Sequence, residues 1–182
     1  MSKSRLTILS EIAIFSAIAL VFDKFPLFTM PQGGSVSLVM LPILLIALRH
    51  GLIAGLLTGG IVGTIQLLYG GYFLNIFQVF LDYALSYAGI GLAGLLSPLL
   101  TKQKDLKQAA FTISLAGFLG GSVRLLTTFL SGIIFYADYA PAGTPVWIYS
   151  FTYNISYILP STLLACLLLT LLYKAQPNFF NK

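Results

Sequence analysis

Residues 76–96 read IFQVFLDYALSYAGIGLAGLL, an apolar stretch that contains a single charged residue, Asp82. The stretch is long enough to cross a bilayer as a helix, which takes about 20 residues. A carboxylate at membrane depth is costly, and such a group usually faces a bundle interior or a cavity and marks a ligand or ion site. We therefore expect Asp82 to belong to a functional site.

The composition of the whole chain indicates a membrane protein. Of its 182 residues, 58% are hydrophobic and only 8% are charged, whereas soluble domains carry about 25% charged residues. We predict an all-α membrane protein with six transmembrane helices and a single domain over residues 1–182, with no room for a soluble catalytic domain. The predicted helices cover residues 7–22, 37–48, 52–68, 76–96, 109–135 and a segment that follows Pro145.

The net charge of +5 is distributed as an orientation signal rather than as a nucleic-acid surface. With six spans, only Lys24 lies on one side of the membrane. The other basic residues outside the apolar segments lie on the opposite side: Lys3, Arg5, Arg49, Lys102, Lys104, Lys107, Lys174 and Lys182. Basic loops mark the cytoplasmic side. We therefore predict a multi-pass protein of the cell membrane, embedded in the lipid bilayer, with cytoplasmic N- and C-termini and no nucleic-acid partner. The single histidine, His50, is expected at the surface.

Small residues spaced by four mark places where helices can approach closely. Ala13 and Ala17 have this spacing in the first predicted helix, and Gly55, Gly59 and Gly63 have it in the third. For the glycines we expect packing within the bundle. For the two alanines, packing within the bundle and docking on a partner protein are both open.

Polar and aromatic residues gather in the outer halves of the last three predicted helices. Gln78, Asp82 and Ser86 follow each other at helical spacing. Arg124 is the only other charge deep in an apolar segment, and a polar, aromatic segment at 147–157 begins the sixth helix. We expect these faces to line a common cavity.

The groups of this cavity suit binding better than catalysis. The pattern contains no nucleophile with an adjacent base and no His/Cys cluster, so we expect neither an enzyme nor a metal site. A carboxylate among aromatic rings can hold an organic cation, and each desolvated cation–π contact contributes up to about 2 kcal/mol. The joint pattern of Asp82, Tyr149 and Asn154 favours a binding site. The alternative is an aromatic belt at the membrane interface, with Asp82 paired to Arg124 as a structural bridge; for Trp147 alone, belt and site are equally open.

Five segments resemble the thiamine-specific S-components of energy-coupling factor transporters. They are MPQGGSVS (30–37), LPIL (41–44), FLDY (80–83), SGIIF (131–135) and YAPAGTPVWIYSFTYN (139–154). The resemblance extends over nearly the whole chain, and the last segment is its most specific part. It implies capture of thiamine, as cargo and not as a cofactor, at the outer face. Uptake would then require a transmembrane coupling subunit and two cytoplasmic ATPases of the ABC type.

The resemblance also implies roles for individual residues. Asp82 matches the acidic position that contacts the cationic ligand, and Tyr136 matches an aromatic position that stacks on it. Tyr149 and Asn154 match positions that hydrogen-bond the aminopyrimidine, and Arg124 matches a basic position near the hydroxyl end. The full set of predicted ligand-binding residues is Asp82, Tyr83, Arg124, Thr128, Tyr136, Trp147, Tyr149 and Asn154.

Two further segments match functional parts of the same family. The loop that holds Gln32, Gly33 and Gly34 resembles a lid over the binding site. Ala13 and Ala17 match the small-residue motif that docks on the coupling subunit.

One position departs from the family pattern and keeps other ligands open. Members of the family carry a histidine beside the thiazolium where this chain has Thr128. A thiamine precursor, or another small cationic or heteroaromatic vitamin, is therefore an alternative ligand. A stand-alone secondary transporter is a further alternative, although the sequence shows no convincing internal repeat of the kind that such transporters carry.

Overall fold

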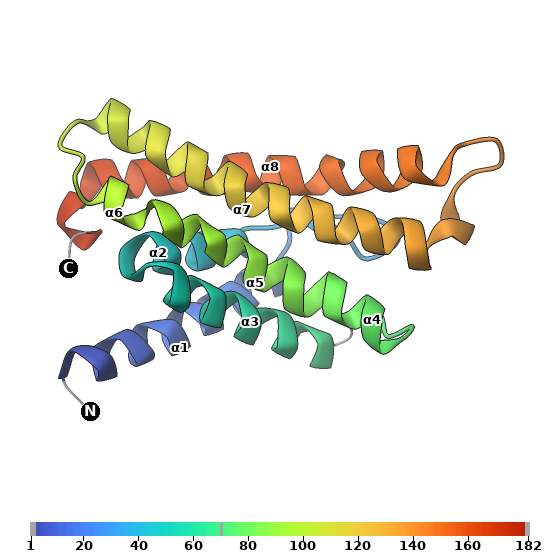
Figure 1. The fold of residues 1–182 in the computed structure, drawn as a ribbon, viewed down its shortest axis with the longest axis horizontal. Coiled ribbons are helices and arrows are strands. Elements are labelled where there is room, and N and C mark those ends of the chain that lie inside the picture. The colour runs from blue at the N-terminus through green and yellow to red at the C-terminus, as the bar shows by residue number, and fades with distance from the viewer. Residues whose placement is uncertain (1–2, 70, 181–182) are drawn as a thin grey trace.

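The computed structural model describes residues 3–69 and 71–180 and shows a bundle of long helices (Figure 1). The first helices are α1 (Lys3–Lys24), α2 (Met40–His50) and α3 (Leu52–Leu68). A continuous helix at 76–100 follows, and two helices of 30 residues close the chain, α7 (Leu106–Phe135) and α8 (Val146–Ala175). Short 3₁₀ turns cover Ala137–Tyr139 and Pro177–Phe179.

The helix at 76–100 changes its winding along its length. It consists of α4 (Ile76–Val79), a π-helical turn (Phe80–Leu85), α5 (Ser86–Ile90), a 3₁₀ segment (Gly91–Leu96) and α6 (Ser97–Leu100). The wide π-helical turn contains Asp82. Such turns inside α-helices are frequent at functional sites.

The predicted all-α fold is confirmed at the level of six helices in the described part of the chain. Four of them are long and apolar enough to cross a membrane: Arg5–Lys24, Ile76–Leu100, Leu106–Phe135 and Val146–Ala175. Helices α2 and α3 are apolar but shorter, with 11 and 17 residues. The count of six spans stays a prediction.

The segment between α1 and α2, expected as a loop, contains a small hairpin. Strands β1 (Phe28–Thr29) and β2 (Ser35–Val36) pair antiparallel. The turn is closed by a 2.6 Å hydrogen bond from the Met30 N–H to the Gly34 carbonyl, and Gly33 has a φ of 92°. Residues other than glycine rarely adopt this backbone conformation, so Gly33 makes the turn possible.

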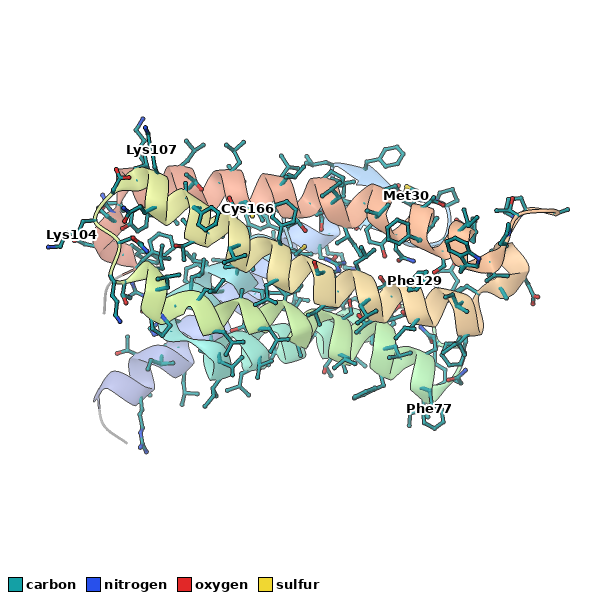
Figure 2. The ribbon with its side chains drawn as sticks, turned by 45° about the horizontal axis from the view of Figure 1, so that its top comes forward. Met30, Phe77, Lys104, Lys107, Phe129 and Cys166 are labelled. Carbon is teal, nitrogen blue, oxygen red and sulfur yellow. The ribbon has the colours of Figure 1, made fainter. Side chains whose placement is uncertain are left out.

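The two ends of the chain lie at the same end of the bundle (Figure 1). Lys104 and Lys107 lie at that end too, whereas Phe77 lies at the opposite end (Figure 2). These two lysines therefore lie at the end of the bundle that holds the chain termini. Lys182 lies outside the described residues, and the cytoplasmic orientation stays a prediction.

The glycine spacing in α3 brings its backbone against the helix at 76–100. A Cβ atom on Gly59 would overlap the carbonyl oxygen of Tyr87, and one on Gly63 would overlap the carbonyl oxygen of Tyr83. The predicted close packing is therefore confirmed, and it occurs at the turns that hold two cavity tyrosines. Gly60, by contrast, faces open space.

An ion-pair cluster ties α1 to the turn between α2 and α3. The Glu11 carboxylate accepts hydrogen bonds from Arg49 Nε at 2.7 Å and from Arg49 Nη2 at 3.1 Å. His50 Nε2 lies 2.7 Å from the same carboxylate. The Arg49 guanidinium also lies over the Phe179 ring, 4.3 Å from its centre. The expectation of a surface His50 is wrong, because the pairing with Glu11 buries its ring, which is only 5% exposed.

Substitution of Gly59 tests the close packing of α3. Gly59→Ala should destabilise the bundle by about 1–3 kcal/mol, because the added methyl group has no space. The measurement is thermal unfolding of the purified protein in detergent. Gly60→Ala is the matched control and should leave the melting temperature unchanged or raise it, since alanine stabilises helices by up to about 1 kcal/mol over glycine. Equal melting temperatures for the two variants would contradict the proposed packing.

Candidate ligand-binding cavity

A cavity of about 250 Å³ lies in the half of the bundle away from the chain termini. The hairpin, the π-helical turn, α5 and the nearby parts of α1, α3, α7 and α8 surround it. Ten of the residues predicted for the site line it: Gln32, Gly33, Gly34, Asp82, Tyr83, Arg124, Thr128, Tyr136, Tyr149 and Asn154. Residues far apart in the sequence therefore meet in one place.

Hydrogen bonds from two different helices hold the Asp82 carboxylate. Asn75 caps the start of α4 by accepting bonds from the N–H groups of Phe77 and Gln78 at 2.9 and 3.0 Å. The Gln78 side chain, fully buried, then donates to Asp82 Oδ2 at 2.6 Å. The Tyr136 hydroxyl, just beyond the end of α7, donates to the same oxygen at 3.3 Å.

The proton on Tyr136 is stable in this setting. Burial raises the pKa of the Tyr136 phenol, and the neighbouring Asp82 carboxylate raises it further. The phenol therefore stays protonated at neutral pH and keeps donating to Asp82. Since both hydrogen bonds reach Oδ2, the other carboxylate oxygen takes part in neither.

Arg124 lies in the cavity wall but forms no salt bridge with Asp82 within the described structure. Its guanidinium stacks on the Tyr87 ring, 4.6 Å from the ring centre, and Nη2 donates to the Tyr87 hydroxyl at 3.2 Å. The structural bridge considered from the sequence is therefore not formed. The two charges serve different parts of the cavity.

Asn154 and Thr128 are tied to the helices that carry them. Asn154 Nδ2 donates to the Ser150 carbonyl at 2.8 Å, and its Oδ1 accepts from the Tyr157 hydroxyl at 2.6 Å. The Thr128 hydroxyl donates to the Arg124 carbonyl at 3.0 Å. These bonds fix the orientation of both side chains at the cavity wall.

The structure does not bring Trp147, predicted as a ligand-binding residue, to the cavity wall. Its side chain is 59% exposed on the first turn of α8. Tyr149 follows two residues later and lines the cavity. Two positions apart on an α-helix are about 200° apart around its axis, so both side chains cannot face the same side.

The hairpin is fastened over the cavity by one tyrosine of α8. The hydroxyl of Tyr153 accepts hydrogen bonds from the backbone N–H groups of Gln32 and Gly34, both at 3.2 Å. A Cβ on Gly34 would lie 2.6 Å from Cε1 of Tyr157, so only glycine lets the hairpin lie this close. The placement agrees with a lid, whose movement stays a prediction.

Several lining residues were not among the predicted ligand-binding set. Six of them are tyrosines. Two others, Asp23 and Gln66, pair through a 2.8 Å hydrogen bond from Gln66 Nε2 to Asp23 Oδ2. The first helix ends at Lys24, two residues later than expected, and this extension brings Asp23 to the cavity. A carboxylate at a helix end is ordinary in a membrane protein, so no sequence pattern pointed to Asp23. No cluster of three or more His, Cys, Asp or Glu side chains that could hold a metal occurs among the described residues.

Comparison with known proteins identifies the family of this chain. The sequence model of a family described as thiamine transporter protein (Thia_YuaJ) matches residues 9–181. The chain belongs to this family. It is 39% identical to the thiamine transporter ThiT of Bacillus subtilis over 98% of this chain and 96% of that protein. It is 30% identical to the ThiT of Lacticaseibacillus paracasei over 97% and 91% of the two chains.

A solved structure of a family member has the same fold. The chain superimposes on ThiT from Listeria monocytogenes with a TM-score of 0.91 and 30% sequence identity. The match covers 98% of this chain and 99% of that one. The resemblance identified from the sequence is therefore confirmed at the level of family and fold.

Loss of the Tyr153 hydroxyl tests how the hairpin is held. Tyr153→Phe should raise amide hydrogen exchange at Gln32 and Gly34 by about fivefold, because each lost hydrogen bond contributes about 1 kcal/mol. Exchange measured by mass spectrometry on peptides that cover the hairpin gives the answer. Tyr173→Phe removes a hydroxyl bond to the Gln103 carbonyl near the basic end of the bundle, and serves as the control. Unchanged exchange in Tyr153→Phe would show that the Tyr153 hydroxyl does not hold the hairpin.

Proposed function

We propose that the protein is the thiamine-binding S-component of an energy-coupling factor importer and captures thiamine in the cavity described above. The observation that carries the proposal is the Asp82 carboxylate, which lines a cavity surrounded by tyrosines and is not neutralised by Arg124. A cationic ligand would supply the missing counter-charge. The family membership of the chain supports thiamine as that cation.

The aromatic rings of the cavity suit the two rings of thiamine. Tyr136 and Tyr139 pack with their ring centres 6.0 Å apart, and Tyr149 and Tyr153 with theirs 5.9 Å apart. Such pairs present several ring faces to one small volume. A thiazolium held against these faces would gain up to about 2 kcal/mol for each desolvated cation–π contact, in addition to its attraction to Asp82.

The open flank of α1 supports docking on a transmembrane coupling subunit. Only 17% of its most apolar stretch is buried within the bundle, against 39% in each of the other three candidate spans. Ala13 and Ala17 both lie on the exposed side of this helix. Small exposed residues four apart let another helix approach closely. Two cytoplasmic ATPases would then drive uptake through that subunit, with both termini of the chain on the cytoplasmic side.

Thr128 favours one alternative ligand within the same fold. It lines the cavity at the position where the family resemblance leads us to expect a histidine beside the thiazolium. Threonine has no ring that could contact the thiazolium. A ligand that contains only the pyrimidine would therefore lose little binding free energy relative to thiamine. Calorimetric titration with thiamine and with its free aminopyrimidine distinguishes the two. Binding of the pyrimidine alone would replace thiamine as the ligand, and absence of heat with either at micromolar concentration would overturn the proposed function.

Neutralising Asp82 should weaken thiamine binding. Asp82→Asn keeps the shape of the side chain but removes the counter-charge, and unpairing a desolvated charge costs about 2–5 kcal/mol. The dissociation constant measured by calorimetry should rise at least about 30-fold. Asp138→Asn makes the same change at an exposed position outside the cavity, and should leave the constant unchanged. Equal affinities of Asp82→Asn and the unmodified protein would contradict a role for Asp82 as counter-ion.

A bulky residue on α1 should separate binding from transport. Ala17→Trp should leave thiamine affinity within about twofold but abolish uptake in cells that also contain the coupling subunit and ATPases, because the helices could no longer approach. Leu167→Trp, at a 57% exposed position on α8, is the control and should retain uptake. Normal uptake by Ala17→Trp would show that docking occurs elsewhere. Uptake by the unmodified chain alone would identify a secondary transporter instead.

A further inference from the structure

One end of the cavity carries opposite charges that the binding of a cation does not explain. Asp23, at the end of α1, and Arg124, in α7, both line it and interact electrostatically. Gln66, in α3, donates to Asp23, and the Arg124 guanidinium is fixed against Tyr87. Three helices therefore bring a carboxylate, an amide and a guanidinium to one place.

These groups keep unused hydrogen-bonding capacity of both kinds. Arg124 is only 6% exposed, and within the described structure its Nε has no hydrogen-bond partner. The buried Oε1 of Gln66 likewise has none among the described residues. A guanidinium nitrogen can only donate, whereas an amide oxygen and a carboxylate can only accept. Buried groups of this kind are costly unless a partner satisfies them.

We propose that Asp23 is a specificity residue, which makes this end of the cavity accept a neutral hydroxyl group and disfavour an anion such as a phosphate ester. A hydroxyl can donate to Asp23 while it accepts from Arg124. The inference rests on the proposed function, since thiamine supplies a hydroxyl and its monophosphate supplies the matching ester.

A phosphate group would meet the wrong charges here. It carries about −1.5 to −2 charges at neutral pH and only accepts hydrogen bonds, apart from a residual proton. Arg124 would attract it, but Asp23 would repel it, because like charges brought together are unfavourable. Arg124 alone would make the site favour phosphate. Asp23 is therefore the element that decides between the two forms of the ligand.

Lys24 does not reverse this balance. Its side chain also lines the cavity, but Nζ donates to the Tyr69 carbonyl at 3.1 Å and lies 5.1 Å from the centre of the Tyr69 ring. The ammonium group keeps its charge, but it is exposed, so water and salt screen it. Specificity built on repulsion of the wrong ligand is a general device, and here the acidic side chain supplies the repulsion.

The test compares two ligands in matched variants. Calorimetry with thiamine and with thiamine monophosphate gives the ratio of the two dissociation constants. In Asp23→Asn the preference for thiamine over its monophosphate should fall by at least about tenfold, because the repulsion is removed. Asp23→Glu keeps the charge and should keep most of the preference. Asp138→Asn removes an exposed charge outside the cavity and should leave the ratio unchanged.

The outcomes separate this inference from the proposed function. If the unmodified protein does not bind thiamine, the proposed function fails. If it binds thiamine but Asp23→Asn leaves the ratio unchanged, the role of Asp23 fails alone. Should the asparagine variant not yield folded protein, Asp23→Ser removes the same charge and decides the question by the same ratio.

Discussion

The Asp82 carboxylate is withdrawn from water inside an apolar helix, and the surrounding structure is arranged to satisfy it. An unpaired charge in such a place is unfavourable by several kcal/mol unless hydrogen bonds or a counter-charge compensate it. Gln78 provides one bond from the preceding turn, and Tyr136 provides another from the far end of α7. The end of α7 and the helix at 76–100 are thereby joined through one oxygen atom. Asn75 caps the first turn of this helix, and Gln78 lies in that turn.

The backbone around Asp82 adapts to the same requirement. The π-helical turn Phe80–Leu85 widens the helix where the carboxylate lies. On its outer side the carbonyl of Tyr83 contacts Gly63 of α3, at a distance that no side chain would permit. The glycines of α3 and the wide turn therefore act together. They allow a helix of irregular winding to remain packed while its inner side carries a charge.

The parts of the site that could be predicted from the sequence are those that local patterns encode. Asp82 was found from its spacing to other polar residues on the same helix, and Tyr149 and Asn154 from the polar, aromatic start of the last helix; all three line the cavity. Asp23 could not be found this way, because its place depends on where α1 ends and on a contact with Gln66 that is 43 residues away. Trp147 was misplaced because its residue type fits both a membrane interface and a binding site, and only the rotation of α8 decides.

The same limit applies to the basic end of the bundle. His50 looked like a surface residue because no partner stands near it in the sequence, yet its partner Glu11 lies 39 positions away. Family resemblance supplied the identity of the fold and the candidate ligand, which periodicity alone could not. Long-range pairs between polar side chains remain the feature that one sequence does not encode locally.

The fastening of the hairpin has a consequence for how this family can diversify. Tyr153 is bonded by the backbone N–H groups of residues 32 and 34, and every residue except proline provides such a group. The side chain of Gln32 is therefore free to change without loosening the hairpin, although it lies in the cavity wall. Gly34 has no such freedom, because Tyr157 fills the space that a side chain would need. A substitution at position 32 would therefore change the cavity wall while the hairpin stays attached to Tyr153.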